Sequence, residues 1–456
     1  MSKIGIDEIL ETIEIISEQK LNIRSVTLGI NILGCASSNL QETTECIKQK
    51  ILDYAPDFIK TTSYVEKKFS VPIINKRLTV SPVALLLEPF HDRAEDAGLE
   101  IALALDKACK ESNIDLVGGY TALVARGISR GSEALIKSIP KVLSTTNHVC
   151  SSLEVGRTTV GINVDAINMA AKVVKETSIL TGGIGNARFV TLSNAPSDIP
   201  FMAAGFYGLG EGQSSLNVAI SGPGVIHSII RKGNNLTFNE LAEEIKKASF
   251  KISRVGQLIG KEIVHGMGGK IKMGSVDLSL APAPEEGESI AEIIEKMGID
   301  KIGGAGSIAA LAILTDAIKK GGLMGASIAG GYSGAFIPVS EDLGMVRAAK
   351  SGSINIQLLE AMTSVCSTGL DMVAVPGEIT WQTLAAIMMD EIAIGVYTNK
   401  TTGVRILPIT GSKPGDVVEL GGLFGKAVVM SVPNISSVKF VQRGGNIPPP
   451  TFSTRN

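Results

Sequence analysis

The chain has 456 residues, 44% of them hydrophobic and 19% charged, so it can bury one large core or several smaller ones. Its 43 Lys and Arg residues against 45 Asp and Glu give a net charge of −2. This argues against nucleic acid or an anionic membrane as the main partner, because such binding relies on excess positive charge. No apolar run reaches transmembrane length. These properties predict a cytoplasmic protein with no nucleic-acid partner and no membrane partner.

The predicted elements alternate between helix and strand along the chain. The first 124 residues predict a helix over 6–19, a strand over 23–32, a helix over 40–55, a helix over 92–113 and a strand over 114–124. Between them, the segments 58–69 and 77–87 look like strands, or like a strand and a helix start. An extended segment over 141–156, a helix over 162–180 and a strand over 187–196 follow. Beyond them come strand–turn–helix over 215–230, a helix over 236–268, a Pro-rich loop and helix within 281–306, and the final segments 403–411 and 417–432. Asn39 and Ser289 are positioned to cap helices.

Alternating strands and helices without a linker predict an α/β fold in one large domain, residues 1–456, with a Pro-rich tail over 446–456. A closed or nearly closed α/β barrel competes with an open, doubly wound sheet, and the length without a linker favours the barrel.

Cofactor and metal motifs are sparse. The Gly-rich stretches 181–190 and 303–322 match neither GxGxxG after a strand nor a Walker A loop, which disfavours a dinucleotide enzyme and favours close packing. The four histidines are isolated, so no metal site is predicted. Carboxylates near His91, or Asp390 with Glu391, fit solvated helix faces better than a cation site. The cofactor stays open, and the five dispersed cysteines predict reduced thiols.

Two segments carry candidate chemistry. Cys366 lies in "SVCSTGLDM", where a turn could activate a thiol, and Asp371 and Glu378 follow as candidate acid/base groups. The alternative is that Cys366 is a small apolar residue in the core. The second segment, 207–224, places Glu211, Gln213 and Ser214 just before an apolar strand, where α/β folds hold ligands, or where a solvated turn would lie. The composition does not decide between these alternatives.

Several stretches read together resemble a known family. They are "RSVTLGINI", "FSVPIINKRLTVSPVALL", "DLVGGYTALV", "SVCSTGLDMVAVPGEI", "MDEIAIGVYTNKTTGVRILP" and "QRGGNIPPP". The chain resembles uncharacterised protein family two-ten, also called domain of unknown function seven-eleven or "PFL family protein". The resemblance runs from about residue 4 to the C-terminus. It implies an α/β barrel of the pyruvate formate-lyase and ribonucleotide reductase type, with about ten strands in two half-barrels meeting near 195–225, and a homodimer.

The resemblance also bears on the chemistry. Relatives in fold use a thiyl cysteine and, in some, a glycyl radical, but Arg443, Gly444 and Gly445 lack the hydrophobic and aromatic neighbours of that signature. No cysteine lies within 195–225 either. The resemblance therefore supports "SVCSTGLDM" as a site segment, with non-radical chemistry.

Three functions follow as hypotheses. The leading one is a cytosolic enzyme acting on a small anionic metabolite, with Cys366, Asp371 and Glu378 as catalytic residues. Its substrate contacts are Glu211, Gln213, Ser214, Lys400, Arg405 and Arg443. The second is a catalytically inactive, metabolite-sensing or regulatory homodimer. The third and least favoured is a glycyl-radical enzyme.

Overall fold

The computed structural model describes residues 21–197, 201–233 and 235–454, and its centre is a mixed sheet. The principal strands are β1 (Asn22–Ile30), β2 (Ile73–Val80), β3 (Leu116–Leu123), β4 (Val149–Arg157), β6 (Phe189–Ser193), β7 (Ser214–Ser221), β8 (Lys272–Leu280), β9 (Gly334–Ala335), β10 (Gly369–Pro376) and β11 (Thr402–Ile409). They neighbour one another in the order β10-β11-β6-β4-β3-β2-β1-β7-β8-β9. The predicted α/β class and the expected number of about ten strands are confirmed.

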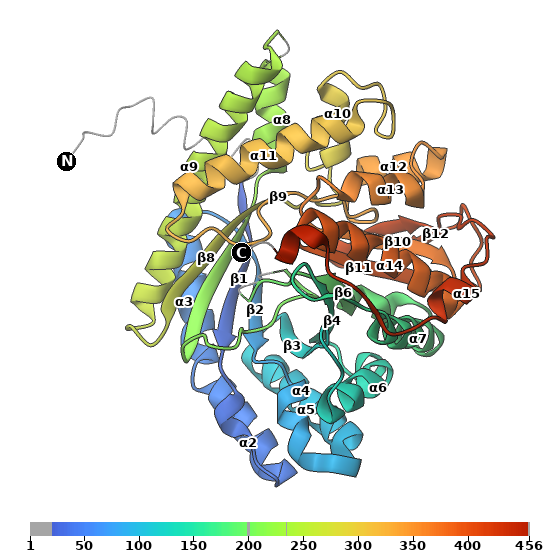
Figure 1. Ribbon diagram of the computed structural model, residues 1–456. Helices are drawn as coiled ribbons and strands as arrows, with labels where there is room; N and C mark the ends of the chain where they lie inside the picture. The colour runs from blue at the N-terminus through green and yellow to red at the C-terminus, as the bar shows by residue number, and fades with distance from the viewer. Residues whose placement is uncertain (1–20, 198–200, 234, 455–456) are drawn as a thin grey trace.

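The helices lie around these strands (Figure 1). They are α2 (Leu40–Leu52), α3 (Ala55–Phe69), α4 (Ala84–Leu87), α5 (Ala94–Ser112), α6 (Arg130–Thr145), α7 (Val164–Thr181), α8 (Pro223–Lys232), α9 (Phe238–Gly266), α10 (Ile290–Lys296), α11 (Ser307–Gly325), α12 (Leu343–Ser351), α13 (Ile356–Thr363), α14 (Trp381–Thr398) and α15 (Val438–Val441). The short strands β5 (Gly161–Asn163) and β14 (Asn446–Ile447) pair at the sheet's margin, and β12 (Val417–Glu419) pairs with β13 (Lys426–Val428). Within the described ranges, no helix is both long and apolar enough to span a membrane.

The strands form two parallel sets. β1, β2, β3, β4 and β6 are parallel to one another, as are β7, β8 and β9, and β10 with β11. β1 is antiparallel to β7, and β6 is antiparallel to β11. At the ends of the path no ladder joins the described β9 and β10. Two backbone hydrogen bonds connect them instead, from Ser367 N to Ala335 O and from Val339 N to Asp371 O, each 3.0 Å.

Local sequence explains most of the elements. Asn39 accepts hydrogen bonds from two amides of the first turn of α2, and Ser289 accepts one at the start of α10, so both predicted caps are confirmed. The extended segment predicted over 58–69 is wrong, because these residues belong to α3. Its β-branched threonines suggested a strand, but Phe58, Thr62 and Val65 are buried at helical spacing, and a proline occupies the first turn. The helix predicted over 6–19 lies outside the described residues.

The cysteines only partly follow the expectation of reduced thiols. Cys109, Cys150 and Cys366 are free and buried. Cys35 and Cys46 form a disulfide between the segment after β1 and helix α2, so the expectation is wrong for this pair. Dispersed spacing did not reveal the pair because the chain folds back over an intervening helix start.

Part of the connection between β6 and β7 enters the interior. Residues 202–207 are buried, and Tyr207 N donates to Val80 O on β2 at 2.9 Å. Gly118 on β3 makes room for this segment, because a Cβ there would lie 2.2 Å from Gly205 O and 3.0 Å from the sulfur of Met202. The pair of glycines in "DLVGGYTALV" therefore permits a loop to pass across the strands.

We expect Gly118→Ala to lower the free energy of unfolding by about 3 kcal/mol, because the added methyl group overlaps a backbone carbonyl. Gly127→Ala is the matched control, since nothing lies within 4 Å of a Cβ at that position. Urea denaturation of both variants measures the difference. Equal stabilities would show that the loop moves aside at no cost.

Candidate functional site

A cavity of about 300 Å³ lies inside the ring of strands. Eight of the ten strands contribute to its wall, which places it in the interior. The strand residues of the wall are Arg24 (β1), Asn75 and Arg77 (β2), Leu116 (β3), Cys150 (β4), Ala219 (β7), Asp277 and Ser279 (β8), Asp371 (β10) and Arg405 (β11). Connecting segments add Arg188, Phe201, Met202, Tyr332, Phe336, Glu341 and the 3-10 turn Gly422–Phe424.

A buried ion-pair network crosses this wall. Arg405 Nε lies 2.6 Å from Asp371 Oδ1, and its Nη2 lies 3.0 Å from Asp371 Oδ2 and 3.1 Å from Glu341 Oε1. Arg24 Nη2 on β1 reaches the other oxygen of Glu341 at 3.2 Å. Burial raises the pKa of Glu341, while Arg405 and Arg24 act against the shift. The network joins a strand of the first parallel set to the second set.

Two more guanidinium groups line the cavity. Arg188 donates to the carbonyls of Leu143 (2.7 Å) and Val149 (3.0 Å) and, at 3.4 Å, to the hydroxyl of Thr146. Burial lowers the pKa of Arg188. Burial, followed by the positive charge of Arg24, lowers the pKa of Arg77 to about 10. Both groups remain protonated at neutral pH, so the cavity keeps positive charge in a setting of low dielectric.

The Cys150 thiol shares the cavity with these cations. Its side chain is 1% exposed, and burial raises its pKa, with Arg188, Arg77 and Arg405 opposing the shift. At neutral pH Cys150 is therefore a neutral thiol facing a positively charged wall.

Aromatic rings form the rest of the wall. Phe201 and Tyr332 stack at a centroid distance of 5.5 Å, and Phe336 meets both rings edge-on at 6.0 and 6.3 Å. The Arg405 guanidinium lies over the Phe201 ring at 5.3 Å and over the Phe424 ring at 6.0 Å. The arginine is thus held by carboxylates at its edge and by rings at its faces.

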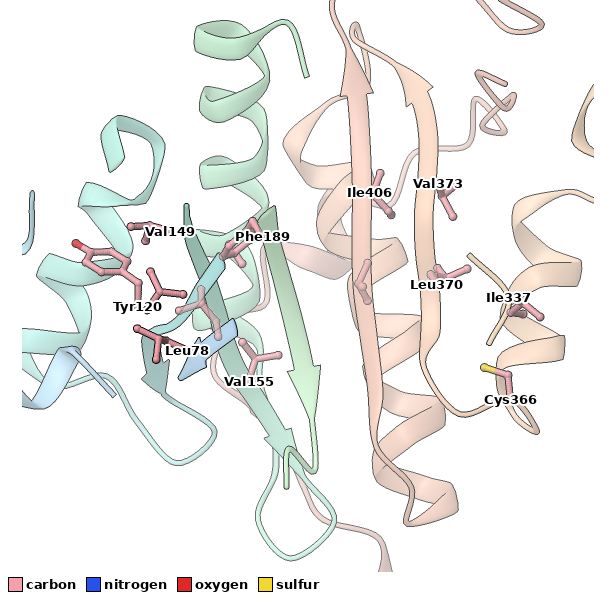
Figure 2. Packing of buried hydrophobic residues seen from close by; sticks show 14 of the residues in the cluster. Leu78, Tyr120, Val149, Val155, Phe189, Ile337, Cys366, Leu370, Val373 and Ile406 are labelled. Atoms are coloured by element: carbon pink, nitrogen blue, oxygen red, sulfur yellow. The ribbon is translucent and has the colours of Figure 1, made fainter. Parts of the chain in front are cut away.

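Of the predicted site residues, the structure brings Asp371 and Arg405 together in this cavity. Cys366 does not line it. The thiol is 1% exposed within the main apolar cluster, where Figure 2 shows it with Ile337 and Leu370, and it accepts a hydrogen bond from Gly369 N at 3.3 Å. Gly369, which lies close to Cys366, is in register with Gly403 on β11, and Gly403 is in register with Leu192 near the C-terminal end of β6. The cavity residue Arg188 directly precedes the N-terminal end of β6. Cys366 and the cavity therefore lie toward opposite ends of the barrel.

The remaining predicted residues also lie away from the cavity. Lys400 Nζ donates to the carbonyls of Thr363 and Cys366, an arrangement that caps the C-terminus of α13. Ser214 is buried and donates to Lys270 O at 3.1 Å. The exposed ones, none of which is among the lining residues, are Glu211, Gln213, Glu378 and Arg443. Their functional roles stay predictions. Within the described residues no group of three or more His, Cys, Asp or Glu side chains could hold a metal ion.

Sequence reasoning did not select Arg24, Arg77, Arg188, Cys150 or Tyr332. A signal existed for Arg24, which is the single charged residue inside a β-branched strand of a fold whose helices cover the outer face. Such a charge must face the interior.

Near Cys366, a carboxyl group is held in its neutral form. The Thr363 hydroxyl has two acceptors within reach, Glu360 O at 2.6 Å and Glu391 Oε2 at 2.7 Å. A hydrogen bond donated to Glu391 favours its charged form, so it is burial that keeps this group neutral. Burial raises the pKa of Glu391 to about 8, with the hydrogen bond of Thr363 and the charge of Lys400 acting against it.

This acid predicts a pH dependence of stability. The folded chain keeps the proton of Glu391 between the unfolded pKa near 4.5 and the folded value of about 8, so stability falls by about 1.4 kcal/mol per pH unit across that window. We expect Glu391→Gln to remove this contribution. The free energy of unfolding of the variant, relative to that of the native chain, should therefore rise from pH 5 to pH 8. Urea denaturation at several pH values checks it, with exposed Glu378→Gln as control. Parallel pH curves for the native chain and Glu391→Gln would contradict the assignment.

The ion-pair network also gives a stability prediction. Arg405→Met leaves Asp371 and Glu341 buried beside one another without their shared cation, which should destabilise the fold by about 3–5 kcal/mol. Lys426→Met, which removes an exposed pair with Glu419, should change little. Chemical denaturation compares the two, and a similar small effect for both would mean that the network contributes no net stability.

Comparison with known proteins places the chain in a family. A family model described as "Uncharacterised ACR (DUF711)" matches residues 14–422. A UPF0210 protein of Carboxydothermus hydrogenoformans is 50% identical over 452 residues, which cover 98% of this chain and 99% of the relative. One from Methanocaldococcus jannaschii is 48% identical over 456 residues, covering 99% of each chain, and one from Listeria monocytogenes is 48% identical over 453 residues, also covering 99% of each.

Solved structures give weaker matches. The anaerobic ribonucleotide reductase from Thermotoga maritima in complex with dATP and CTP has a TM-score of 0.48 and 8% identity, covering 85% of this chain and 74% of that one. The same enzyme with citrate in the active site has a TM-score of 0.39 and 6% identity, covering 85% and 81%. At these values neither structure carries a conclusion about the site. The curated relatives, which match nearly the whole chain, and the family model, which matches residues 14–422, show the family: this protein belongs to the UPF0210 (DUF711) family.

Proposed function

We propose that the barrel cavity binds a small anionic metabolite and that the protein is an enzyme acting on it. The observation that carries the proposal is the convergence of four arginines, Arg24, Arg77, Arg188 and Arg405, on one interior cavity. Small-molecule sites are concave and largely apolar, with a few converging polar groups that fix the ligand's orientation. The aromatic and aliphatic part of this wall supplies the apolar surface.

The charge of the wall supports an anion. Four acids also line the cavity, but Asp115 is exposed, which leaves Asp277, Glu341 and Asp371 as buried carboxylates beside the four arginines. Arg188 donates hydrogen bonds to two carbonyls and a hydroxyl. An anion placed beside Arg188 and Arg77 would offset positive charge that the protein has taken out of water.

Catalysis would rest on groups in the same cavity. Asp371, predicted as a catalytic residue, lines the wall, and Cys150 adds a thiol. We keep non-radical chemistry in the proposal. Its support is that Gly444 and Gly445 are not among the lining residues, and Gly445 N donates to Asp165 at the start of α7. Cys366 and Glu378 stay predicted catalytic residues that nothing tests.

A metabolite sensor without turnover is the second candidate. It is favoured by the pairing of Asp371 and Glu341 with arginines and by the raised pKa of Cys150, since both arrangements make these three groups poor bases. The proposal of a cytoplasmic homodimer accompanies either function. Its support is three free thiols and the exposed apolar side chains of Leu323 and Met324 on α11.

The test is thermal unfolding of the full chain in a panel of small carboxylates and phosphates at constant ionic strength. We expect at least one anion to raise Tm saturably, because a ligand that binds only the folded state stabilises it, while uncharged amides do not. Arg188→Gln should lose the effect, and Lys320→Gln, a charge change on the exposed face of α11, should keep it.

Two outcomes would contradict anion binding: no anion stabilises the chain, or Arg188→Gln responds as the native chain does. NMR of the stabilising anion during incubation then separates the candidates. Conversion of the anion indicates an enzyme, and unchanged spectra with retained binding indicate a sensor.

A further inference from the structure

The Tyr332 hydroxyl is a buried donor without a partner. Its residue is 1% exposed and lines the cavity, and the hydroxyl oxygen makes no hydrogen bond in the part of the chain that the structure describes. The ring is held by stacking on Phe201 and by edge contact with Phe336. Buried hydroxyl groups are normally satisfied, because losing water without a replacement bond is unfavourable. A ligand atom in the cavity would satisfy this one.

The surroundings of the hydroxyl decide which ligand atom fits. Burial, then the carboxylates of Asp371 and Asp277, raise the pKa of Tyr332, so the phenol keeps its proton and donates. Asp371 and Asp277 line the same cavity. A further negative charge beside these two carboxylates is unfavourable, whereas a neutral hydroxyl or keto oxygen can accept from Tyr332.

The basic and the acidic side chains of the wall come largely from different strand sets, with Arg405 on β11 as the exception among the arginines. Arg24, Arg77 and Arg188 come from β1, β2 and the residue before β6, which belong to the first parallel set. The buried acids come from β8, β10 and the segment before α12, after the chain has crossed to the second set. A ligand anion is therefore favoured beside Arg77 and Arg188 rather than beside Tyr332, on which the carboxylates of Asp371 and Asp277 act. Leu116, Met202 and the aromatic rings supply apolar surface on the same wall.

Resting on the anion-binding function proposed above, we propose that the ligand is a hydroxy acid or oxo acid with an apolar body. Its carboxylate lies against Arg77 and Arg188, and its neutral hydroxyl or keto oxygen accepts a hydrogen bond from Tyr332. The apolar body lies against the rings of Phe201 and Phe336.

Three matched probes test this class. 3-Phenyllactate carries a carboxylate, a hydroxyl and an apolar ring; 3-phenylpropionate lacks the hydroxyl; 2-phenylethanol lacks the carboxylate. Calorimetric titration of the full native chain should rank phenyllactate about five- to tenfold tighter than phenylpropionate, the range of one neutral hydrogen bond, with phenylethanol weakest. Tyr332→Phe keeps the ring and removes the donor, so it should abolish the advantage of phenyllactate and leave phenylpropionate unchanged.

The outcomes separate this inference from the anion-binding function. Equal affinities of phenyllactate and phenylpropionate for the native chain would overturn the hydroxy-acid assignment and leave anion binding intact. An advantage of phenyllactate that survives in Tyr332→Phe would likewise overturn the role of the hydroxyl. If neither carboxylate binds and no member of the anion panel stabilises the chain, both proposals are wrong. The comparison of probes on the native chain stands even if the variant does not fold.

Discussion

The structure depends on the burial of charge inside the ring of strands. Arg405 can lie in the interior only because Asp371 and Glu341 neutralise it, and Glu341 in turn holds Arg24 on the far side of the ring. Removing such groups from water is costly, and only close pairing offsets the cost. The network therefore requires β1, β10, β11 and the segment before α12 to approach together. It acts as a constraint on the closure of a sheet whose ends share two backbone hydrogen bonds rather than a ladder.

The same burial explains why the barrel contains a cavity. Guanidinium groups hold their neighbours at hydrogen-bonding distance, and their planar edges cannot interdigitate as aliphatic side chains do. At the other end of β6, Cys366 belongs to the main apolar cluster, and burial keeps the nearby carboxyl group of Glu391 neutral. One end of the barrel is thus part of the core, while the other holds the charged cavity, although both belong to the same strands.

Much of the fold followed from sequence patterns, because alternation of helix and strand and the caps at Asn39 and Ser289 are local properties. The prediction of an extended segment at α3 was wrong, because the threonine content of the segment was given more weight than its helical periodicity. The antiparallel joins β1–β7 and β6–β11 and the disulfide between Cys35 and Cys46 depend on contacts that no local pattern encodes. For the site, Asp371 and Arg405 were predicted, and the structure joins them. Cys366 was selected because its Ser-Thr-Gly turn is distinctive, while Cys150, inside the buried strand β4, had no distinctive local pattern.

The polarity of the site follows from topology. The two parallel sets run in opposite directions, so the N-terminal ends of the first set lie at the same end of the barrel as the C-terminal ends of β7 and β8. A cavity at that end is therefore lined by residues from both sets. Arg24 comes from an early position of β1, and Asp277 from the second half of β8. The first set contributes Arg24, Arg77 and Arg188 to the cavity, and the second contributes Arg405, the three buried acids and the Tyr332 hydroxyl. A ligand with one anionic and one neutral polar end would match Arg188 and the Tyr332 hydroxyl at once, whereas inorganic phosphate would satisfy only the arginines.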